Sequence, residues 1–195
     1  MWRIVLHLSP FTTAAAVVLV FCFTVVFRLA EADRPCAVRR VAALLLVAWT
    51  AVVLLATLAA SDSGTGGGGL WLSPGFDTLI TDSPYVTAEE KRMVWRQWTA
   101  NALMFVPLPV LVTLLWRDLS ALTCFLLCAG AGAAVEATQW LQGNGRVVDL
   151  DDVAFNAFGG ALGIGVNAVA IVTARRLRRT TTAGVSRARG EDGDG

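Results

Sequence analysis

Charge is scarce in this sequence of 195 residues. Only 16% of the residues are charged and 55% are hydrophobic, whereas a soluble domain carries about 25% charged residues. The net charge of +1 gives no basic excess of the kind used to bind nucleic acid, so we expect no nucleic-acid partner. The composition excludes an ordinary soluble domain and is typical of an integral membrane protein.

Residue types that carry several familiar chemistries are also nearly absent. His7 is the single histidine, so no Ser/His/Asp catalytic set can form. The stretch GTGGGG (64–69) lacks the Lys of a phosphate-binding loop. Cys124 and Cys128 share a helix face, but no His or further Cys completes a metal site. We therefore expect no cofactor, although the acidic residues in the C-terminal part of the chain leave open the binding of a divalent cation.

Long apolar runs are what the sequence has in abundance. A membrane-spanning helix needs about 20 mainly apolar residues. Five runs meet or approach this length, at 11–29, 41–60, 102–116, 119–141 and 153–173. The third is short and contains Pro107 and Pro109, which predicts a tilted or kinked helix. The sequence thus predicts an all-α, polytopic membrane helical bundle with about five transmembrane helices.

The arginines indicate an orientation for these helices. Nine of them lie between the first and second runs, between the third and fourth, or directly after the fifth. If the helices alternate, all of them fall on one side, which the positive-inside rule makes the cytoplasm. These residues are Arg28, Arg34, Arg39, Arg40, Arg117, Arg175, Arg176, Arg178 and Arg179. The chain is then a multi-pass protein of the cell membrane with its N-terminus outside and its C-terminus cytoplasmic.

A competing interpretation concerns the first helix. The tripeptide Ala-Glu-Ala at 30–32 follows an apolar stretch and resembles a signal-cleavage site. Cleavage there would leave the arginines of 34–40 on the opposite side of the membrane. A retained first helix fits the charge rule at every loop.

The chain divides into four predicted parts. Residues 1–60 hold two transmembrane helices, and 61–100 hold a long extracytoplasmic Gly-rich loop between helices 2 and 3 with an interfacial helix. Residues 101–174 form a three-helix region, and 175–195 form a disordered cytoplasmic tail. A capping-box pattern at 87–90 predicts a helix that starts there and runs through Trp95, Trp98 and Asn101 into the third span. Five tryptophans are predicted to anchor at the two membrane interfaces. They are Trp71, Trp95, Trp98, Trp116 and Trp140.

Polar residues gather at the predicted outer end of the last two helices. Glu136 and Gln139 share a face of the fourth helix, and an acidic side chain inside a span usually has a partner or a task. Arg146, in the following loop, is the nearest candidate partner for Glu136. If the fifth helix begins near Asp149, then Asp149, Asp152 and Asn156 point the same way, and Asn101 of the third helix joins from the side.

A structural interpretation of the same residues stays open. Asp149 can be the N-cap of the fifth helix, and Asp151 and Asp152 can be favourable charges in its first turn. Glycines on the fifth helix have a packing reason, because small residues let membrane helices approach closely. Gly159, Gly160 and Gly163 are expected to pack against the small residues of the fourth helix at 130–134.

The order and spacing of these residues resemble the signature of the VanZ-like family. The matching positions are Glu136-x-x-Gln139, Gly145-Arg146, Asp149, Asp152-Val153, Asn156, Gly159 or Gly160, and Gly163. The stretch NALMFVPLPVLVTLL (101–115) also resembles a helix of that family, with Pro109 where Gly is usual. The resemblance covers residues 95–170 and implies a small polytopic membrane protein of bacteria. The namesake of the family is associated with tolerance to teicoplanin, a glycopeptide that binds cell-wall precursors outside the membrane.

Three functions lead at this point, and a transporter is a weaker fourth, because five short helices make a small pore unless the protein oligomerises. The first is binding or shielding of a lipid-linked cell-wall precursor at the outer polar site, with Arg146 on a phosphate or carboxylate. The second is an enzyme that uses the carboxylates on such a substrate, with or without a divalent metal. The third is a scaffold in which the hairpin serves only folding. Membrane lipids are expected partners in each case, and the oligomeric state is left open.

Overall fold

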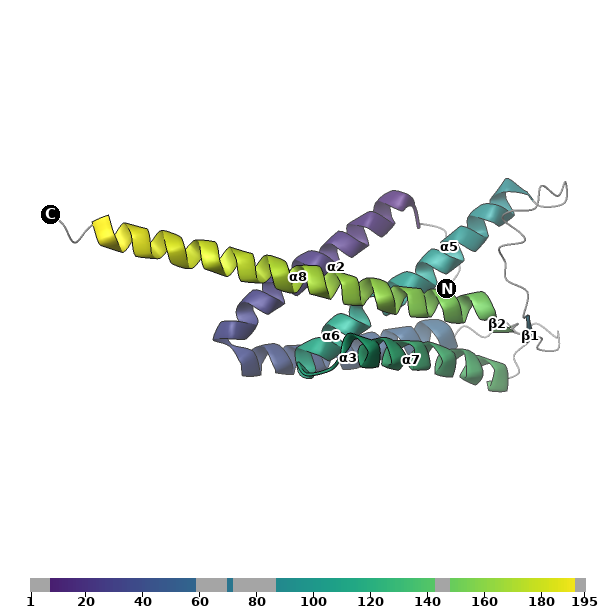
Figure 1. Ribbon diagram of the computed structural model, residues 1–195. Coiled ribbons are helices and arrows are strands. Elements are labelled where there is room, and N and C mark those ends of the chain that lie inside the picture. The colour runs from purple at the N-terminus through teal and green to yellow at the C-terminus, as the bar shows by residue number, and fades with distance from the viewer. Residues whose placement is uncertain (1–7, 59–69, 72–86, 143–147, 192–195) are drawn as a thin grey trace.

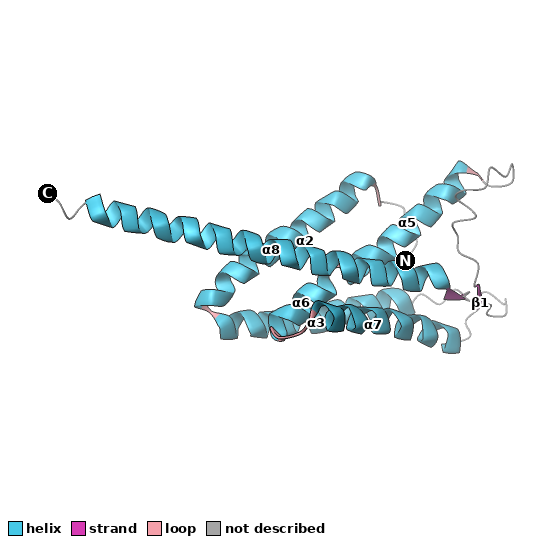
Figure 2. Cartoon of the chain, in the orientation of Figure 1, coloured by secondary structure: helices cyan, strands magenta, loops and turns pink. Residues whose placement is uncertain are grey.

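The computed structural model describes residues 8–58, 70–71, 87–142 and 148–191 (Figure 1). Within these ranges the chain consists of helices, short connecting loops and one pair of two-residue strands (Figure 2). The helices are α2 (Pro10–Asp33), α3 (Pro35–Leu58), α5 (Ala88–Phe105), α6 (Pro107–Leu115), α7 (Ala121–Gln142) and α8 (Leu150–Glu191). They provide five spans long and apolar enough to cross a membrane, because α5 and α6 together form one. The predicted all-α membrane bundle is confirmed.

Local capping signals explain where several helices begin. Ser9 and Thr12 form a capping box before α2, and Pro10 occupies the first turn, where its missing N–H costs nothing. Thr87 and Glu90 form the predicted capping box before α5: the Glu90 carboxylate accepts a hydrogen bond of 2.7 Å from the Thr87 backbone N–H. Pro35 separates α2 from α3, because its ring is incompatible with the preceding helix turn.

The third span is broken, as its prolines predict, and the helix predicted to start at 87–90 runs into it, so the span is longer than its apolar run. Val106 separates α5 from α6, and Pro107 lacks the N–H that would continue the helix. The Nε1 of Trp49 on α3 donates to the Met104 carbonyl at 2.8 Å beside this break, which is how a neighbouring helix satisfies freed backbone groups in lipid. The span runs over 28 residues, Ala88–Leu115. The apolar run is shorter because the first turns of α5 carry polar residues.

The fifth helix differs from its predicted end. The composition predicts a disordered tail from residue 175, whereas α8 continues to Glu191. Ala and Arg are strong helix formers, and no proline interrupts the segment. The predicted long loop at 61–100 falls mostly outside the described residues. The part that is described pairs β1 (Leu70–Trp71) in parallel with β2 (Val148–Asp149), directly before α8.

The core lies around the third span. Half of the residues in the apolar window of α5–α6 are buried, against 6% for α2 and 17% for α3. Two small clusters of buried side chains join α6 to α3, and α5–α6 to α3 and α7; their members are Val38, Ala42, Val110 and Leu114, and Val53, Phe105, Leu108 and Cys128. The remaining apolar side chains of α2 and α3 are available for lipid.

The bundle has two ends that different loops and helix termini form. The α2–α3 turn, the α6–α7 connection and the C-terminal half of α8 lie at one end, and β1, β2 and the first turn of α8 lie at the other (Figure 1). We call the first the arginine end, because it carries Arg28, Arg117, Arg175 and Arg178. The second is called the strand end. This grouping agrees with the alternation on which the orientation was predicted.

Candidate functional site

Asp152 is the point where α5 and α8 meet at the strand end. Its two carboxylate oxygens accept hydrogen bonds of 3.2 and 3.4 Å from Nε2 of Gln97, and one of them also accepts from Nδ2 of Asn101. Gln97 and Asn101 lie four residues apart on α5 and share a face. Two amide donors from one helix thus hold a carboxylate in the first turn of another, where the helix dipole also favours negative charge.

Asn156 lies one turn further along the same face of α8. Its side chain is buried, with 3% of the residue exposed. Within the described part of the chain, its buried Oδ1 has no hydrogen-bond donor. We call Gln97, Asn101, Asp152 and Asn156 the amide–carboxylate cluster. Three of its members, Asn101, Asp152 and Asn156, were predicted as site residues.

Gly132 on α7 leaves the space that the Asn156 side chain fills. A Cβ added at Gly132 would lie 2.9 Å from the Cβ of Asn156, so only glycine admits the asparagine at this depth. The neighbouring contact of α8 with α7 is similar, because a Cβ at Gly160 would lie 2.8 Å from that of Cys128. These two contacts fix the distance between α7 and α8.

Gly159 and Gly163 pack against a different helix from the one predicted. A Cβ at Gly159 would lie 2.0 Å from the Ala102 carbonyl oxygen, and one at Gly163 would lie 2.2 Å from that of Val106. Their partner is therefore the third span rather than residues 130–134 of the fourth helix. The reason is geometric: Gly159 and Gly163 continue the face of Asp152, which contacts α5, whereas Gly160 is turned toward α7.

The predicted residues of α7 stand apart from this cluster. The Nε2 of Gln139 donates to the Thr57 carbonyl at 2.9 Å and so links α7 to the end of α3. Glu136 is buried on α7, with 5% of the residue exposed. Arg146 lies outside the described residues. Asp149 belongs to β2, immediately before α8, and its side chain is not among those described.

The tryptophans divide into two groups. Trp95, Trp116 and Trp140 are each 56% exposed, as interfacial anchors would be. Trp98 is buried, at 2% exposed, and stacks on Phe155 of α8 with ring centroids 4.6 Å apart. Its expected anchoring role is therefore replaced by packing of α5 on α8, about one turn of α8 after Asp152. The side chain of Trp71 lies outside the described part of the chain.

An apolar cavity of about 360 Å³ lies between α3, α5–α6 and α7. Its walls include Val53, Phe105 and Cys128 of the core, and Val135 and Thr138, which neighbour Glu136 and Gln139 on α7. Among the residues that the structure describes, no three His, Cys, Asp or Glu side chains come together as a metal site.

Two polar features escaped the sequence prediction. Gln97 could have been found, because it lies four residues before Asn101 on the same helix face. The second is a network at the arginine end that joins Arg28 and Glu31 of α2 to Thr113, Arg117 and Asn167. Its local signal is an Arg and a Glu three residues apart near the end of an apolar run, together with an Asn inside the last span.

The fold and this cluster define a polytopic helical membrane protein with buried polar groups at one end of its last helix. A family model described as VanZ/LLP1 matches residues 11–171. The chain belongs to the VanZ/LLP1 family. The match extends over the first two helices, which resembled the family only in hydropathy. Neither the search of curated proteins nor that of solved structures gave a match.

Proposed function

We propose that this VanZ/LLP1 protein binds a lipid-linked cell-envelope precursor at the amide–carboxylate cluster, on the extracytoplasmic side, and thereby gives tolerance to teicoplanin. The observation that carries the proposal is the buried Oδ1 of Asn156, which finds no donor within the described residues. Leaving such an acceptor unsatisfied costs about 1–3 kcal/mol. A hydroxyl or amide N–H of a sugar–peptide headgroup would supply the missing donor.

The neighbouring residues suit the same headgroup. The Asp152 carboxylate accepts from two amides of α5, which fixes it one turn from Asn156 on the same face of α8. Arg146 and Asp149 precede α8 in the chain. In this proposal Arg146 contacts a phosphate of the precursor, because a guanidinium matches phosphate geometry, and Asp149 orients it.

The apolar cavity gives the lipid part of the precursor a place. It has about 360 Å³ of space, within the usual range of about 300–1,000 Å³ for ligand pockets. Val135 and Thr138 line it, and they directly precede Glu136 and Gln139 in the sequence. A prenyl chain in this cavity would leave its headgroup near the strand end of the bundle.

Binding is favoured over a metal-assisted reaction. The observation that favours it is that Asp152 is engaged by amide donors from α5. An enzyme acting through these carboxylates therefore has less support than a site that holds its ligand by hydrogen bonds.

Drug susceptibility tests the proposal directly. Wild type, Asp152→Asn and Asp118→Asn are expressed at matched membrane abundance in a glycopeptide-sensitive host, and teicoplanin and vancomycin are titrated. Asp118 is an exposed carboxylate in the α6–α7 connection at the arginine end, so its variant controls for loss of one charge. We expect wild type and Asp118→Asn to raise teicoplanin tolerance and Asp152→Asn to lose it.

Binding is measured in parallel with the purified full chain and a polyprenyl diphosphate that carries a disaccharide–peptide. Asp152→Asn is expected to weaken this binding, with or without a chelator of divalent ions. Equal protection by all three proteins, or no protection by wild type, would remove the resistance role. Binding that disappears with the chelator would instead favour the metal-assisted enzyme.

A further inference from the structure

A second cavity lies at the arginine end, between α2, the α6–α7 region and α8. It has about 470 Å³ of space, again within the range of ligand pockets. Its polar lining includes Arg28, Glu31, Arg117, Arg175 and Arg178, and its apolar lining includes Leu119 and Ile171. None of these residues belongs to the site proposed above, which lies at the strand end.

The inner wall of this cavity is a fixed ion-pair network. The side chains of Arg28 and Glu31 are each only 9% exposed, and Nη1 of Arg28 donates to Oε2 of Glu31 at 3.0 Å. Arg28 also donates from Nε and Nη2 to Oδ1 of Asn167, at 3.3 and 2.9 Å, and from Nη2 to Oγ1 of Thr113 at 2.9 Å. Arg28 is therefore a positioning residue, with its donors directed into the protein.

The Glu31 carboxylate, like the Arg28 guanidinium, is bonded within the protein. Its Oε1 accepts a hydrogen bond of 2.8 Å from Nε of Arg117, so each of its two oxygens has its own arginine. The Arg117 side chain remains 47% exposed. In the described residues, Nε makes the one hydrogen bond of this guanidinium, and its Nη groups remain available to a ligand.

Positive charge exceeds negative charge in this cavity. Four guanidinium groups and one carboxylate line it, an excess of three charges. Asp33, which pairs with Arg178 at 3.3 Å, reduces the excess but does not cancel it. Charges at membrane depth are costly unless they are paired, so a cavity of this kind favours an anion.

The shape of the cavity indicates which anion fits. Arginine binds phosphate through paired N–H donors, and basic pockets between transmembrane helices at the cytoplasmic level bind the headgroups of anionic lipids. Leu119 and Ile171 supply apolar walls beside the guanidinium groups. A free phosphate ion would make no apolar contact with these walls, whereas the glycerol and first methylenes of a lipid would.

We propose that this cavity binds the phosphate group of an anionic phospholipid, with Arg117 and Arg175 as its ligands and the Arg28–Glu31 pair positioning Arg117. The lipid would join α2 to α6 and α8 at the membrane surface. This site is independent of the precursor site, since the two lie at opposite ends of α8.

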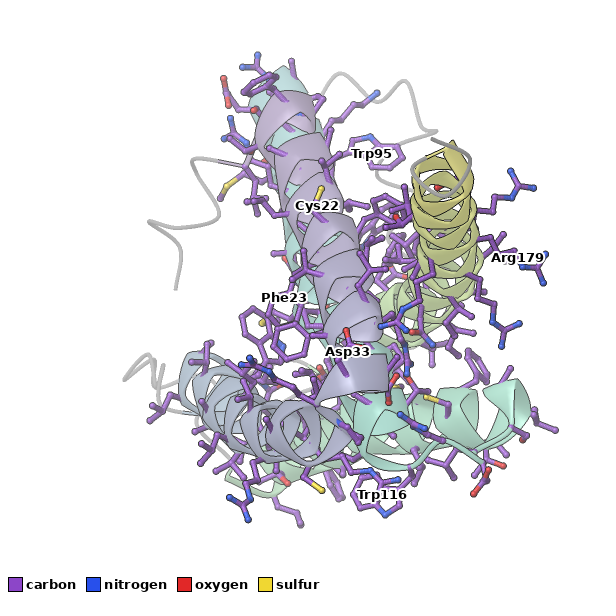
Figure 3. All side chains as sticks on the ribbon, turned by 90° about the vertical axis from the view of Figure 1, so that its left-hand side faces the viewer. Cys22, Phe23, Asp33, Trp95, Trp116 and Arg179 are labelled. Carbon is purple, nitrogen blue, oxygen red and sulfur yellow. The ribbon has the colours of Figure 1, made fainter. Side chains whose placement is uncertain are left out.

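The test uses paired double variants of the full chain. Arg117→Gln with Arg175→Gln removes two arginines of the cavity. Arg176→Gln with Arg179→Gln removes two that do not line it; Arg179 points away from the other helices in Figure 3. The net charge changes equally, so diffuse attraction to anionic membranes falls equally in both. Unfolding midpoints of both variants confirm that they are folded.

Native mass spectrometry measures the bound lipid when each protein, in detergent, is titrated with phosphatidylglycerol, phosphatidylcholine or inorganic phosphate. We expect wild type to hold one phosphatidylglycerol in preference to phosphatidylcholine. The cavity variant should bind it at least about tenfold more weakly, and the Arg176/Arg179 variant as wild type does. Equal weakening of both variants, or of neither, would overturn the site. Displacement of the lipid by inorganic phosphate at millimolar concentration would overturn the lipid as its source.

Discussion

Buried polar side chains at the two ends of the bundle are satisfied to different degrees. At the arginine end, Glu31 pairs with two arginines, and Arg28 also bonds two neutral side chains. At the strand end, Oδ1 of Asn156 has no donor within the described residues. A satisfied buried pair stabilises the fold only while it is intact, and an unsatisfied acceptor lowers stability unless a ligand covers it. Substitutions at the two ends should therefore have opposite effects on stability.

Glu31→Gln should destabilise the bundle strongly. The substitution leaves two guanidinium groups facing a neutral amide, and breaking a buried ion pair in this way costs about 3 kcal/mol. The measurement is the free energy of unfolding of the purified protein during titration with sodium dodecyl sulfate, followed by circular dichroism. Asp33→Asn is the matched control, because the Asp33 side chain is 78% exposed. It should cost less than about 1 kcal/mol, and an equal loss in both variants would contradict the buried role of Glu31.

Asn156→Leu should separate stability from binding. Leucine has a similar size and branching, and it replaces an acceptor that has no donor within the described residues. Unfolding free energy should stay the same or rise by up to about 1 kcal/mol, while binding of the lipid-linked precursor falls. The two readouts are the detergent titration above and the precursor titration on the same preparation. A destabilised variant that still binds would show that Asn156 serves packing alone.

At the scale of elements, α8 is positioned by glycines on two of its faces. Gly159 and Gly163 let it touch the backbone of the third span, and Gly160 and Gly132 let it approach α7. These contacts bring Asp152 within hydrogen-bond distance of Gln97 and Asn101. The candidate site therefore depends on close helix packing at Asn156 itself and in the next two turns of α8.

Gly159→Ala should push α8 away from the third span. The added Cβ would lie 2.0 Å from the Ala102 carbonyl oxygen, and backbone cannot move aside as a side chain can. We expect a loss of at least about 3 kcal/mol in unfolding free energy, together with loss of precursor binding. Gly165→Ala lies on the same helix with nothing within 4 Å of the added Cβ, and should stabilise by about 0.5–1 kcal/mol. Equal effects of the two substitutions would contradict this packing.

Helix starts and breaks could be predicted from the sequence because they depend on local residues. The Thr87 capping box and the break at Pro107 are set within one turn of chain. The continuous helix from the capping box into the third span was predicted too, although the apolar run alone is shorter than the span. The last helix, by contrast, was predicted to end too early, because a basic composition indicates solvent exposure but does not exclude a helix.

At the scale of the whole molecule, the pairing of helices could not be predicted from hydropathy. Arg28 contacts Asn167, 139 residues further along the chain. The local sequence around either residue does not identify the other as its partner. For the same reason, Gly159 and Gly163 were assigned to the wrong neighbour. Asp152 and Asn156 share one helix face and were proposed together, with Asn101 of the third span beside them, whereas Gln97, on the same face as Asn101, was missed. Gln139, on another helix, bonds Thr57 instead.

The predicted orientation places the arginine end in the cytoplasm, and cysteine labelling can test it. Cys36 is exposed at this end, at the start of α3, and Cys124 and Cys128 are buried. With Cys22 replaced by Ala, a membrane-impermeant maleimide should label Cys36 only after the cells are permeabilised. An added cysteine at Ala88, at the start of α5, should be labelled in intact cells. Labelling of Cys36 in intact cells would show that the arginine end faces outside. Cleavage of the chain at 30–32 would give the same labelling. Cleavage would in addition shorten the membrane-bound protein and remove Arg28 and Glu31 from the lipid cavity, so the mass of the purified chain distinguishes these two cases.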